Sequence, residues 1–135
     1  MQIKDVMSNH PVTVAPEQTL AEAAEIMRRI DTGFIPVGEN DRLIGTITDR
    51  DIVINGLAQG KAADSAVRDA MSSDLYYCYQ DQDVGEVARN MGEQQIRRMP
   101  VVDREKKLVG IVSLGDLSTE GAASAAGAAL ELISE

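Results

Sequence analysis

Residues 45–53 read GTITDRDIV, and residues 110–117 read GIVSLGDL. In both stretches an apolar run ends in a hydroxyl residue, and an acid follows three positions later. The two hydroxyl–acid pairs are Thr48 with Asp51 and Ser113 with Asp116. A short apolar run is typical of a strand, and this spacing of hydroxyl and acid is typical of a helix N-terminus. Each stretch therefore predicts a strand that leads directly into a helix.

The two stretches belong to an internal repeat that covers most of the chain. IKDVMS at residues 3–8 recurs as VRDAMS at residues 67–72, an offset of 64 positions. One residue is inserted in the second copy, in the turn DREKK, and from there Gly45 corresponds to Gly110 at an offset of 65. Polar turns tolerate such insertions. We therefore interpret the two halves as copies of one supersecondary unit.

Each copy shows the same order of predicted elements. A short extended stretch (11–15 or 75–79) precedes a helix that opens with a capping box, and two short strands around a polar turn precede a final helix. The order β-α-β-β-α predicts an α/β unit with a small three-stranded sheet. Because a unit of about 50–60 residues buries little core alone, we expect the two copies to pack through their sheets about a pseudo-twofold axis.

These patterns divide the chain into a first repeat at 1–60, a linker at 61–66, a second repeat at 67–119 and a small-residue tail at 120–135. Alanines in the tail favour a helix, whereas Gly121 and Gly127 weaken that prediction. Its last residues, AALELISE, are interpreted as a helix against the body of the protein or against a dimer partner.

Composition and charge exclude several classes of protein. The 135 residues are 44% hydrophobic and 26% charged, as in ordinary globular domains, and a net charge of −9 argues against nonspecific nucleic-acid binding. No apolar stretch is long enough to span a bilayer, and the N-terminus lacks the features of a signal peptide. With Cys78 as its only cysteine, the chain forms no intrachain disulfide. We therefore expect a cytoplasmic protein without a nucleic-acid or membrane partner.

No set of residues points to catalysis or to a metal. His10 is the only histidine and Cys78 the only cysteine, and they occupy positions that do not correspond between the repeats. One residue of each kind cannot supply the three or four nitrogen and sulfur ligands of a usual zinc site. The chain also has no glycine-rich phosphate loop and no nucleophile elbow. We expect a protein that is not an enzyme, has no catalytic residue or metal site, and requires no cofactor.

The duplicated motifs together resemble the tandem CBS domain, also called a Bateman module. The resemblance covers residues 3 to about 118 and includes Pro36-Val37, Pro100-Val101, both glycines and both hydroxyl–acid pairs. TDRDIVINGLAQG and IRRMPVV further resemble small stand-alone bacterial proteins of the hypoxic-response type. The resemblance implies a regulatory sensor whose clefts between the repeats bind AMP, ADP, ATP, NAD or S-adenosylmethionine. It also implies signalling to a partner protein in trans and a role in stress response.

The resemblance also gives roles to individual residues. A carboxylate offers two acceptor oxygens that match the cis hydroxyls of a ribose, and a hydroxyl one turn away reaches ribose or phosphate. The expected ribose-binding residues are Thr48, Asp51, Ser113 and Asp116. Expected contacts of adenine with side chains and backbone come from Val12, Thr32, Gly33, Phe34, Ile35, Tyr76, Ile96, Met99 and Ile111. The hydroxyl–acid pairs fit simple helix caps equally well, and this alternative stays open.

Phosphate groups require cations, because the acids would repel them. Arg97 and Arg98, whose planar guanidinium groups suit phosphate, are the candidates in the second copy, and Arg50 is the candidate in the first. The alternative for the arginine pair is a solvated entrance to a strand. Since the first copy has Gly33-Phe34 where the second has the arginine pair, we expect the two clefts to differ.

Two further expectations concern assembly. DIVINGLA (51–58) and NMGEQQI (90–96) carry more apolar side chains than one buried face needs, which predicts a homodimer. A module that assembles proteins without binding a ligand is the alternative function. Such a module would share the fold but would not need both acids.

Overall fold

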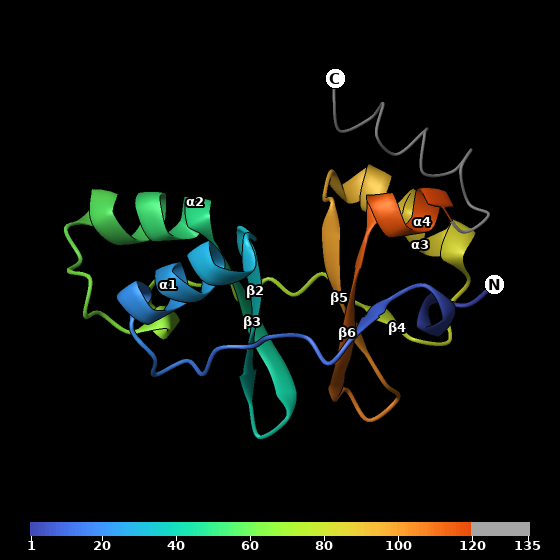
Figure 1. The fold of residues 1–135 in the computed structure, drawn as a ribbon, viewed down its shortest axis with the longest axis horizontal. Coiled ribbons are helices and arrows are strands. Elements are labelled where there is room, and N and C mark those ends of the chain that lie inside the picture. The colour runs from blue at the N-terminus through green and yellow to red at the C-terminus, as the bar shows by residue number, and fades with distance from the viewer. Residues whose placement is uncertain (120–135) are drawn as a thin grey trace. The chain divides into compact units, whose positions relative to one another are not determined.

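The computed structural model describes residues 1–119, and the chain divides into two compact units (Figure 1). We call Val12–Leu75 the central unit, and Met1–Pro11 together with the chain from Tyr76 onward the terminal unit. These boundaries differ from those of the sequence repeats. The leading segment of each repeat, 3–8 or 67–72, belongs to the unit that is otherwise built from the other repeat.

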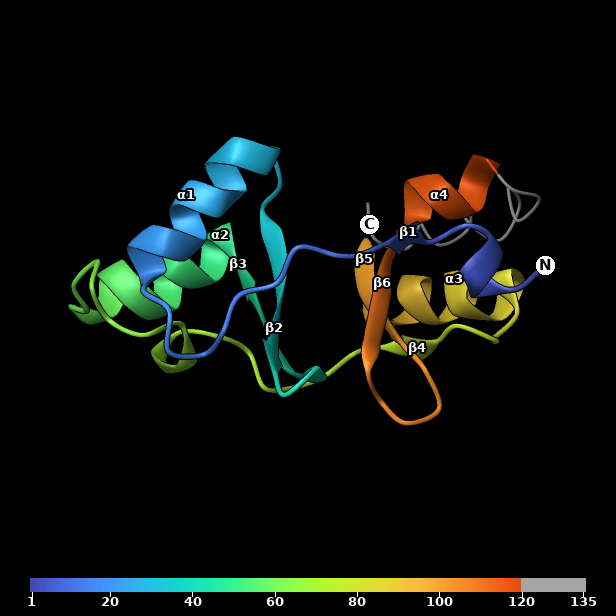
Figure 2. The ribbon, with the colours of Figure 1, turned by 60° about the horizontal axis from the view of Figure 1, so that its bottom comes forward.

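The terminal unit contains a four-stranded sheet in the order β1-β6-β5-β4. Only the β4–β5 pair is parallel. In Figures 1 and 2 the blue start of the chain lies beside β6, so the first residues add a fourth strand to the three that the repeat predicts. The elements of this unit are η1 (Ile3–Asp5), β1 (Ser8–Asn9), β4 (Cys78–Tyr79), α3 (Val84–Gln94), β5 (Arg98–Val102), β6 (Leu108–Ser113) and α4 (Leu114–Thr119).

The central unit repeats this arrangement with shorter edges. Its two-stranded sheet is flanked by single bridges, from Val14 to Val37 in parallel and from Thr46 to Ser72 in antiparallel orientation. After β3 the chain turns directly into one continuous helical stretch, α2, η2 and η3, in which η2 is a π-helix. The elements are α1 (Leu20–Ile30), β2 (Phe34–Glu39), β3 (Arg42–Thr48), α2 (Asp49–Asp51), η2 (Ile52–Gly56), η3 (Leu57–Gln59) and η4 (Val67–Asp69).

The predicted helix starts are confirmed by their caps. The Thr19 hydroxyl accepts the Glu22 N–H at 3.0 Å before α1, and the Asp83 carboxylate accepts the N–H groups of Gly85 and Glu86 before α3. Each cap satisfies N–H groups that have no partner within the helix. The repeats therefore share helix starts as well as sequence.

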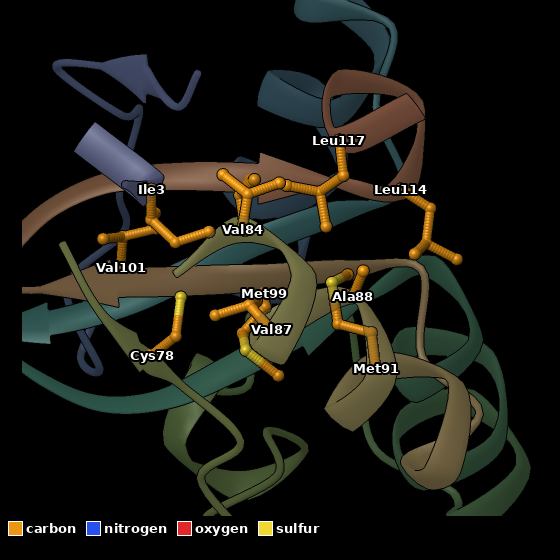
Figure 3. Close-up of a cluster of buried hydrophobic side chains, with 11 residues drawn as sticks. Ile3, Cys78, Val84, Val87, Ala88, Met91, Met99, Val101, Leu114 and Leu117 are labelled. Carbon is orange, nitrogen blue, oxygen red and sulfur yellow. The ribbon is translucent and has the colours of Figure 1, made fainter. Parts of the chain in front are cut away.

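Each unit has its own apolar core, and the exchanged segments fill part of it. Ile3 is fully buried in the terminal core, and Val67, its counterpart in the second repeat, is fully buried in the central core. The terminal core consists of Ile3, Cys78, Val84, Val87, Ala88, Met91, Met99, Val101, Val112, Leu114 and Leu117 (Figure 3). The central core consists of Val14, Leu20, Ala23, Met27, Ile35, Val37, Ile47, Val67 and Ala70.

The two repeated glycines make room for the exchanged segments. A Cβ atom on Gly110 would lie 2.7 Å from the sulfur of Met7 and 2.7 Å from the Ser8 carbonyl oxygen. A Cβ atom on Gly45 would meet Met71 and Ser72 in the same way, at 2.8 Å. The Met-Ser pair of one repeat and the glycine of the other are therefore contact partners.

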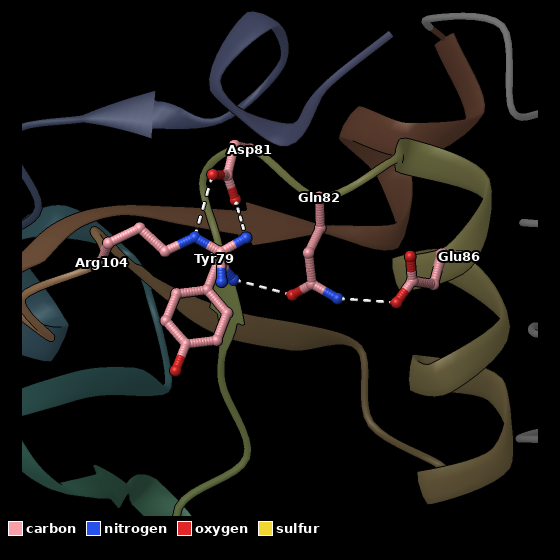
Figure 4. Close-up of polar contacts among 5 residues, drawn as sticks. All are labelled: Tyr79, Asp81, Gln82, Glu86 and Arg104. Carbon is pink, nitrogen blue, oxygen red and sulfur yellow. Dashed lines mark hydrogen bonds and ion pairs between the residues drawn. The ribbon is translucent and has the colours of Figure 1, made fainter.

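The turn with the inserted residue is anchored to the segment that follows β4 (Figure 4). Arg104 donates two hydrogen bonds to Asp81, at 3.0 and 2.7 Å, and its guanidinium carbon lies 4.3 Å from the ring centroid of Tyr79. These hydrogen bonds lower the pKa of Asp81. The anchor fixes the β5–β6 turn without reaching the hydroxyl–acid pair at the far end of β6.

Two further expectations concern membrane-spanning helices and a helix near residue 135. No helix among residues 1–119 is both long enough and apolar enough to cross a membrane. The helix expected for AALELISE lies outside the described residues.

Candidate functional site

In the central unit the start of β2 lies beside the start of α2. Phe34 pairs with Thr48 in the β2–β3 ladder, and the Asp49 N–H donates to the Gly33 carbonyl oxygen at 3.0 Å. These contacts bring the predicted residues 32–35 next to the first hydroxyl–acid pair. We call residues 32–35 and 48–51 the first half-site.

The terminal unit repeats this geometry. Arg98 pairs with Ser113 in the β5–β6 ladder, and the Leu114 N–H donates to the Arg97 carbonyl oxygen at 3.0 Å. Residues 96–99 therefore lie next to the second hydroxyl–acid pair, and together with 113–116 they form the second half-site. Because each half-site lies within one unit, its geometry follows from the fold of that unit alone.

Each hydroxyl–acid pair forms a reciprocal helix cap. Asp51 N–H donates to Thr48 Oγ at 3.0 Å, while Thr48 N–H donates to Asp51 Oδ2 at 2.9 Å. Ser113 and Asp116 make the same two bonds, at 3.2 and 3.1 Å. The caps fix both carboxylates at the edge of their half-sites. They do not exclude a ribose contact, because a carboxylate oxygen has two lone pairs and each cap bond occupies only one oxygen of its acid.

The starts of β2 and β5 present mainly backbone groups, not side chains, to a ligand. Ile35 is fully buried and Met99 is 4% exposed, and both side chains belong to the apolar cores. Any contact of these two residues with a ligand would therefore be made by their backbone groups, since the alternation of a strand directs their side chains inward. Thr32 is held locally, because its hydroxyl accepts the Phe34 N–H at 3.3 Å.

The other expected adenine contacts are dispersed. Ile96 packs against the terminal core, and Ile111 lies on β6 two residues before the second hydroxyl–acid pair. Val12 and Tyr76 are 42% and 48% exposed. Within residues 1–119 no hydrogen bond or strand pairing joins either of them to a half-site.

The half-sites differ in charge. The first contains Asp49, Asp51 and Arg50, and the second contains Arg97, Arg98 and Asp116. The Asp49 carboxylate lies over Gly33, where a Cβ would come within 2.8 Å of Oδ2. The first half-site thus carries an acid at the place where the second carries an arginine side chain, so the predicted inequivalence has a structural basis.

Sequence reasoning missed Asn55. Its side-chain amide donates to Asp51 Oδ1 at 3.3 Å and to the Ala70 carbonyl oxygen at 3.4 Å. The available signal was the spacing of four residues from the acid, which places both side chains on one face of a helix.

The CBS domain family matches residues 3–56 and 67–122 of the chain. The chain therefore belongs to the CBS domain family and contains a pair of these domains, which confirms the expected family and α/β fold.

Among its relatives, the chain is 41% identical over 133 residues to the CBS domain-containing protein YhcV of Bacillus subtilis, covering 98% of this chain and 94% of the relative. It is 40% identical over 117 residues to Hypoxic response protein 1 of Mycobacterium tuberculosis, covering 85% and 81%. The resemblance to small CBS proteins of the hypoxic-response type is confirmed.

Two solved structures are also similar. The crystal structure of Hypoxic Response Protein I with two coordinated zinc ions has a TM-score of 0.80 and 37% identity, covering 89% of this chain and 98% of that one. The CBS domain pair of protein MJ0100, in complex with 5′-methylthioadenosine and S-adenosyl-L-methionine, has a TM-score of 0.77 and 30% identity, covering 88% and 94%. Within residues 1–119 of this chain, no three His, Cys, Asp or Glu side chains gather as a metal site requires.

Proposed function

We propose that this protein is a non-catalytic regulatory module that binds adenosine-containing nucleotides at its half-sites and signals their presence to a partner protein. The observation that carries the proposal is the duplication of one arrangement, a strand start beside a capped hydroxyl and carboxylate, in both units. The MJ0100 domain pair, of the same family, binds two adenosine compounds. AMP, ADP, ATP, NAD and S-adenosylmethionine are the candidate ligands.

The proposed contacts follow from the chemistry of an adenosine. Asp51 or Asp116 would accept hydrogen bonds from the ribose hydroxyls, and Thr48 or Ser113 would reach the ribose or the first phosphate. The base would lie against the backbone of the strand start, where carbonyl and N–H groups can distinguish adenine from other bases. Each of these groups is fixed by its fold before a ligand arrives, which reduces the entropy lost on binding.

Phosphate is proposed to bind at the second half-site, where Arg97 and Arg98 outnumber the single acid. Both arginines are exposed at the start of β5. At the first half-site Arg50 is the candidate cation, but it stands between Asp49 and Asp51 in the sequence. We therefore expect phosphorylated ligands to prefer the second half-site.

The proposed output is a change in a partner protein. A ligand regulates by binding one arrangement of a protein more tightly than another, so it shifts the population between the two. The single cysteine and acidic composition of the chain fit a cytoplasmic, reducing compartment.

We also propose that the protein forms a homodimer. Val53, Ile54 and Leu57 are 52%, 43% and 58% exposed along the helical stretch that follows α2. The other segment expected to contribute is less available, since Met91 and Gly92 of α3 are buried. Sedimentation at micromolar concentration should show twice the 14.5 kDa mass of the chain, and a monomer alone would contradict the proposal.

The test of ligand binding compares adenosine with 2′-deoxyadenosine. Replacing Asp51 or Asp116 by alanine should remove a charge-assisted contact of roughly 1.5–3 kcal/mol, or about 10- to 150-fold in affinity at the occupied half-site. The wild-type protein should prefer the ribose form, and the alanine variant should lose most of that preference. Isothermal titration calorimetry measures both affinities.

The control for this test is Asp83→Ala. Asp83 also caps a helix, with hydrogen bonds at 3.0 and 3.3 Å, but belongs to neither half-site. The Asp83→Ala variant should lose about 1 kcal/mol of stability and keep the wild-type ratio of the affinities for adenosine and 2′-deoxyadenosine. If Asp51→Ala and Asp116→Ala behave like this control, the carboxylates are only caps. If no adenine nucleotide shifts the melting temperature of the wild type, the ligand-free assembly module becomes the better reading.

A further inference from the structure

Asn55 joins the first half-site to a segment of the second repeat. Its amide nitrogen lies 3.3 Å from Asp51 Oδ1 and 3.4 Å from the Ala70 carbonyl oxygen. An amide NH₂ group has two hydrogens, so it can donate to both acceptors at once. Asp51 Oδ2 accepts the Thr48 N–H, and Oδ1 is the oxygen that accepts from Asn55.

Ala70 lies in the exchanged segment 67–72, through which the chain leaves the central unit. Its side chain is 2% exposed, within the central core. Ser72, at the end of the segment, exchanges two backbone hydrogen bonds with Thr46 of β3, at 3.0 and 2.9 Å. Its apolar side chains, its pairing with β3 and its contact with Asn55 all help to hold the segment in place.

Lys61 makes a second tie between the same two parts of the molecule. Its ammonium group donates to the Asn55 carbonyl oxygen at 3.1 Å and also to the Asp69 carbonyl oxygen. Lys61 thus holds the end of the helical stretch to segment 67–72, as Asn55 does, but makes no contact with Asp51. This difference separates a purely structural tie from one that includes the acid of the half-site.

We propose that Asn55 is a positioning residue that couples occupancy of the first half-site to segment 67–72. The proposal rests on the proposed function, because it requires an adenosine ligand at Asp51. Ribose hydroxyls that donate to Asp51 Oδ1 fill both lone pairs of that oxygen and so displace the Asn55 amide. Asn55 then loses one of its two partners, its rotamer is no longer fixed, and its hold on Ala70 weakens. Because coupling is reciprocal, the state of the segment also changes the affinity for the ligand.

The second repeat does not have an asparagine at the corresponding position. With the offset of 65 positions, Asn55 corresponds to Glu120, which lies outside the described residues. An ionised carboxylate has no N–H to donate, so glutamate cannot replace the amide as a donor to Asp116. The amide that contacts Asp51 is therefore not repeated in the sequence of the second repeat.

Hydrogen exchange of the backbone amides in segment 67–72, followed with and without saturating adenosine, tests the coupling. The readout is three amides in the half of the segment that Asn55 contacts: Ala70 and Met71, which donate to Val67, and Ser72, which donates to Thr46. In the wild type, adenosine should speed their exchange by about fivefold or more, at the lower end of usual coupling strengths.

Three variants complete the experiment. Asn55→Ala, and Asn55→Leu of matching size, should show fast exchange without ligand and no further change with adenosine, although calorimetry still detects binding. Lys61→Ala should also start with faster exchange but keep the response to adenosine. Asn55 is exposed, so both of its substitutions are compatible with folding.

The outcomes separate this inference from the proposed function. If adenosine binds the wild type but leaves exchange in segment 67–72 unchanged or slower, the coupling is wrong and the nucleotide-binding function stands. An unchanged response in Asn55→Ala overturns the role of Asn55 in the same way. If calorimetry detects no adenosine binding to the wild type, the proposed function fails, and the coupling fails with it.

Discussion

Cys78 shows how strongly burial in the terminal core changes the chemistry of one residue. It is 2% exposed, and burial raises the pKa of its thiol to about 12 from an ordinary value of 9.0. The folded state therefore binds the thiol proton more tightly than the unfolded state does. This contribution to stability is complete below pH 9 and is lost as the pH rises from 9 toward 12.

We predict that the free energy of unfolding falls more steeply above pH 9 in the wild type than in Cys78→Ala. The difference between the two should change by up to about 1.4 kcal/mol per pH unit. Urea unfolding between pH 8 and 10.5 measures it, and the comparison cancels the titration of all other groups. Parallel curves for the two proteins would contradict the buried, protonated thiol.

A prediction for Arg97 and Arg98 distinguishes two roles: binding the phosphate groups of a ligand, or only shaping the entrance of the strand. Replacing both by alanine should lower the affinity for ATP much more than the affinity for adenosine, because only ATP carries the charge that the guanidinium groups bind. Raising the salt concentration should also weaken ATP binding to the wild type. Arg89→Ala, which removes an exposed arginine from α3, is the control. Equal losses for ATP and adenosine would mean that the arginines only shape the strand entrance.

At the scale of elements, the repeat predicted the helices and the paired strands but not their partners, and the stretch 11–15, expected as a strand, forms only a single bridge at Val14. The caps at Thr19 and Asp83 could be predicted because a helix start depends on local spacing. The pairing of β1 with β6 could not, because similarity between two copies does not show which copy a segment packs on. Ile3 and Val67 are equally apolar in either arrangement, and only the fold shows that each is buried in the other repeat's core.

In the candidate site, too, the local features could be predicted from the sequence and the long-range contacts could not. The hydroxyl–acid spacing fixed both caps, and the strand starts lie where the repeat placed them. The burial of Ile35 and Met99 followed from strand alternation that the sequence already contained. The contact of Asn55 with Ala70 joins residues 15 positions apart, and no local pattern predicts it.

We predict that Gly45→Ala and Gly110→Ala each destabilise the protein by roughly 1–3 kcal/mol. The added methyl group would meet backbone at 2.8 and 2.7 Å respectively, and backbone cannot move aside as a flexible side chain can. Gly38→Ala is the matched control, because its nearest neighbour lies at an ordinary 3.6 Å. Urea unfolding measures all three, and equal stabilities would show that the exchanged segments are not closely packed.

At the scale of the whole molecule, the compact units and the sequence repeats offer two ways to divide the chain. The fragment 12–75 keeps Val67 and Ala70 in its core, whereas the fragment 1–60 lacks both and retains Ile3 without its core. We predict that the fragment 12–75 gives the better dispersed amide NMR spectrum and the more cooperative thermal transition. A folded fragment 1–60 beside an unfolded fragment 12–75 would contradict the division into central and terminal units.

The exchange of leading segments also sets an order of events during synthesis on the ribosome. The central unit has all its parts once Ser72 has left the exit tunnel, so it can close while the rest is still being made. Ser8 must wait for Ile111, its partner in the β1–β6 ladder, which is synthesised more than a hundred residues later. During that interval the apolar side chain of Ile3 has no core to enter. Because such long-range pairing is slow and exposed to aggregation, residues 3–9 are a point of risk until Ile111 has been synthesised.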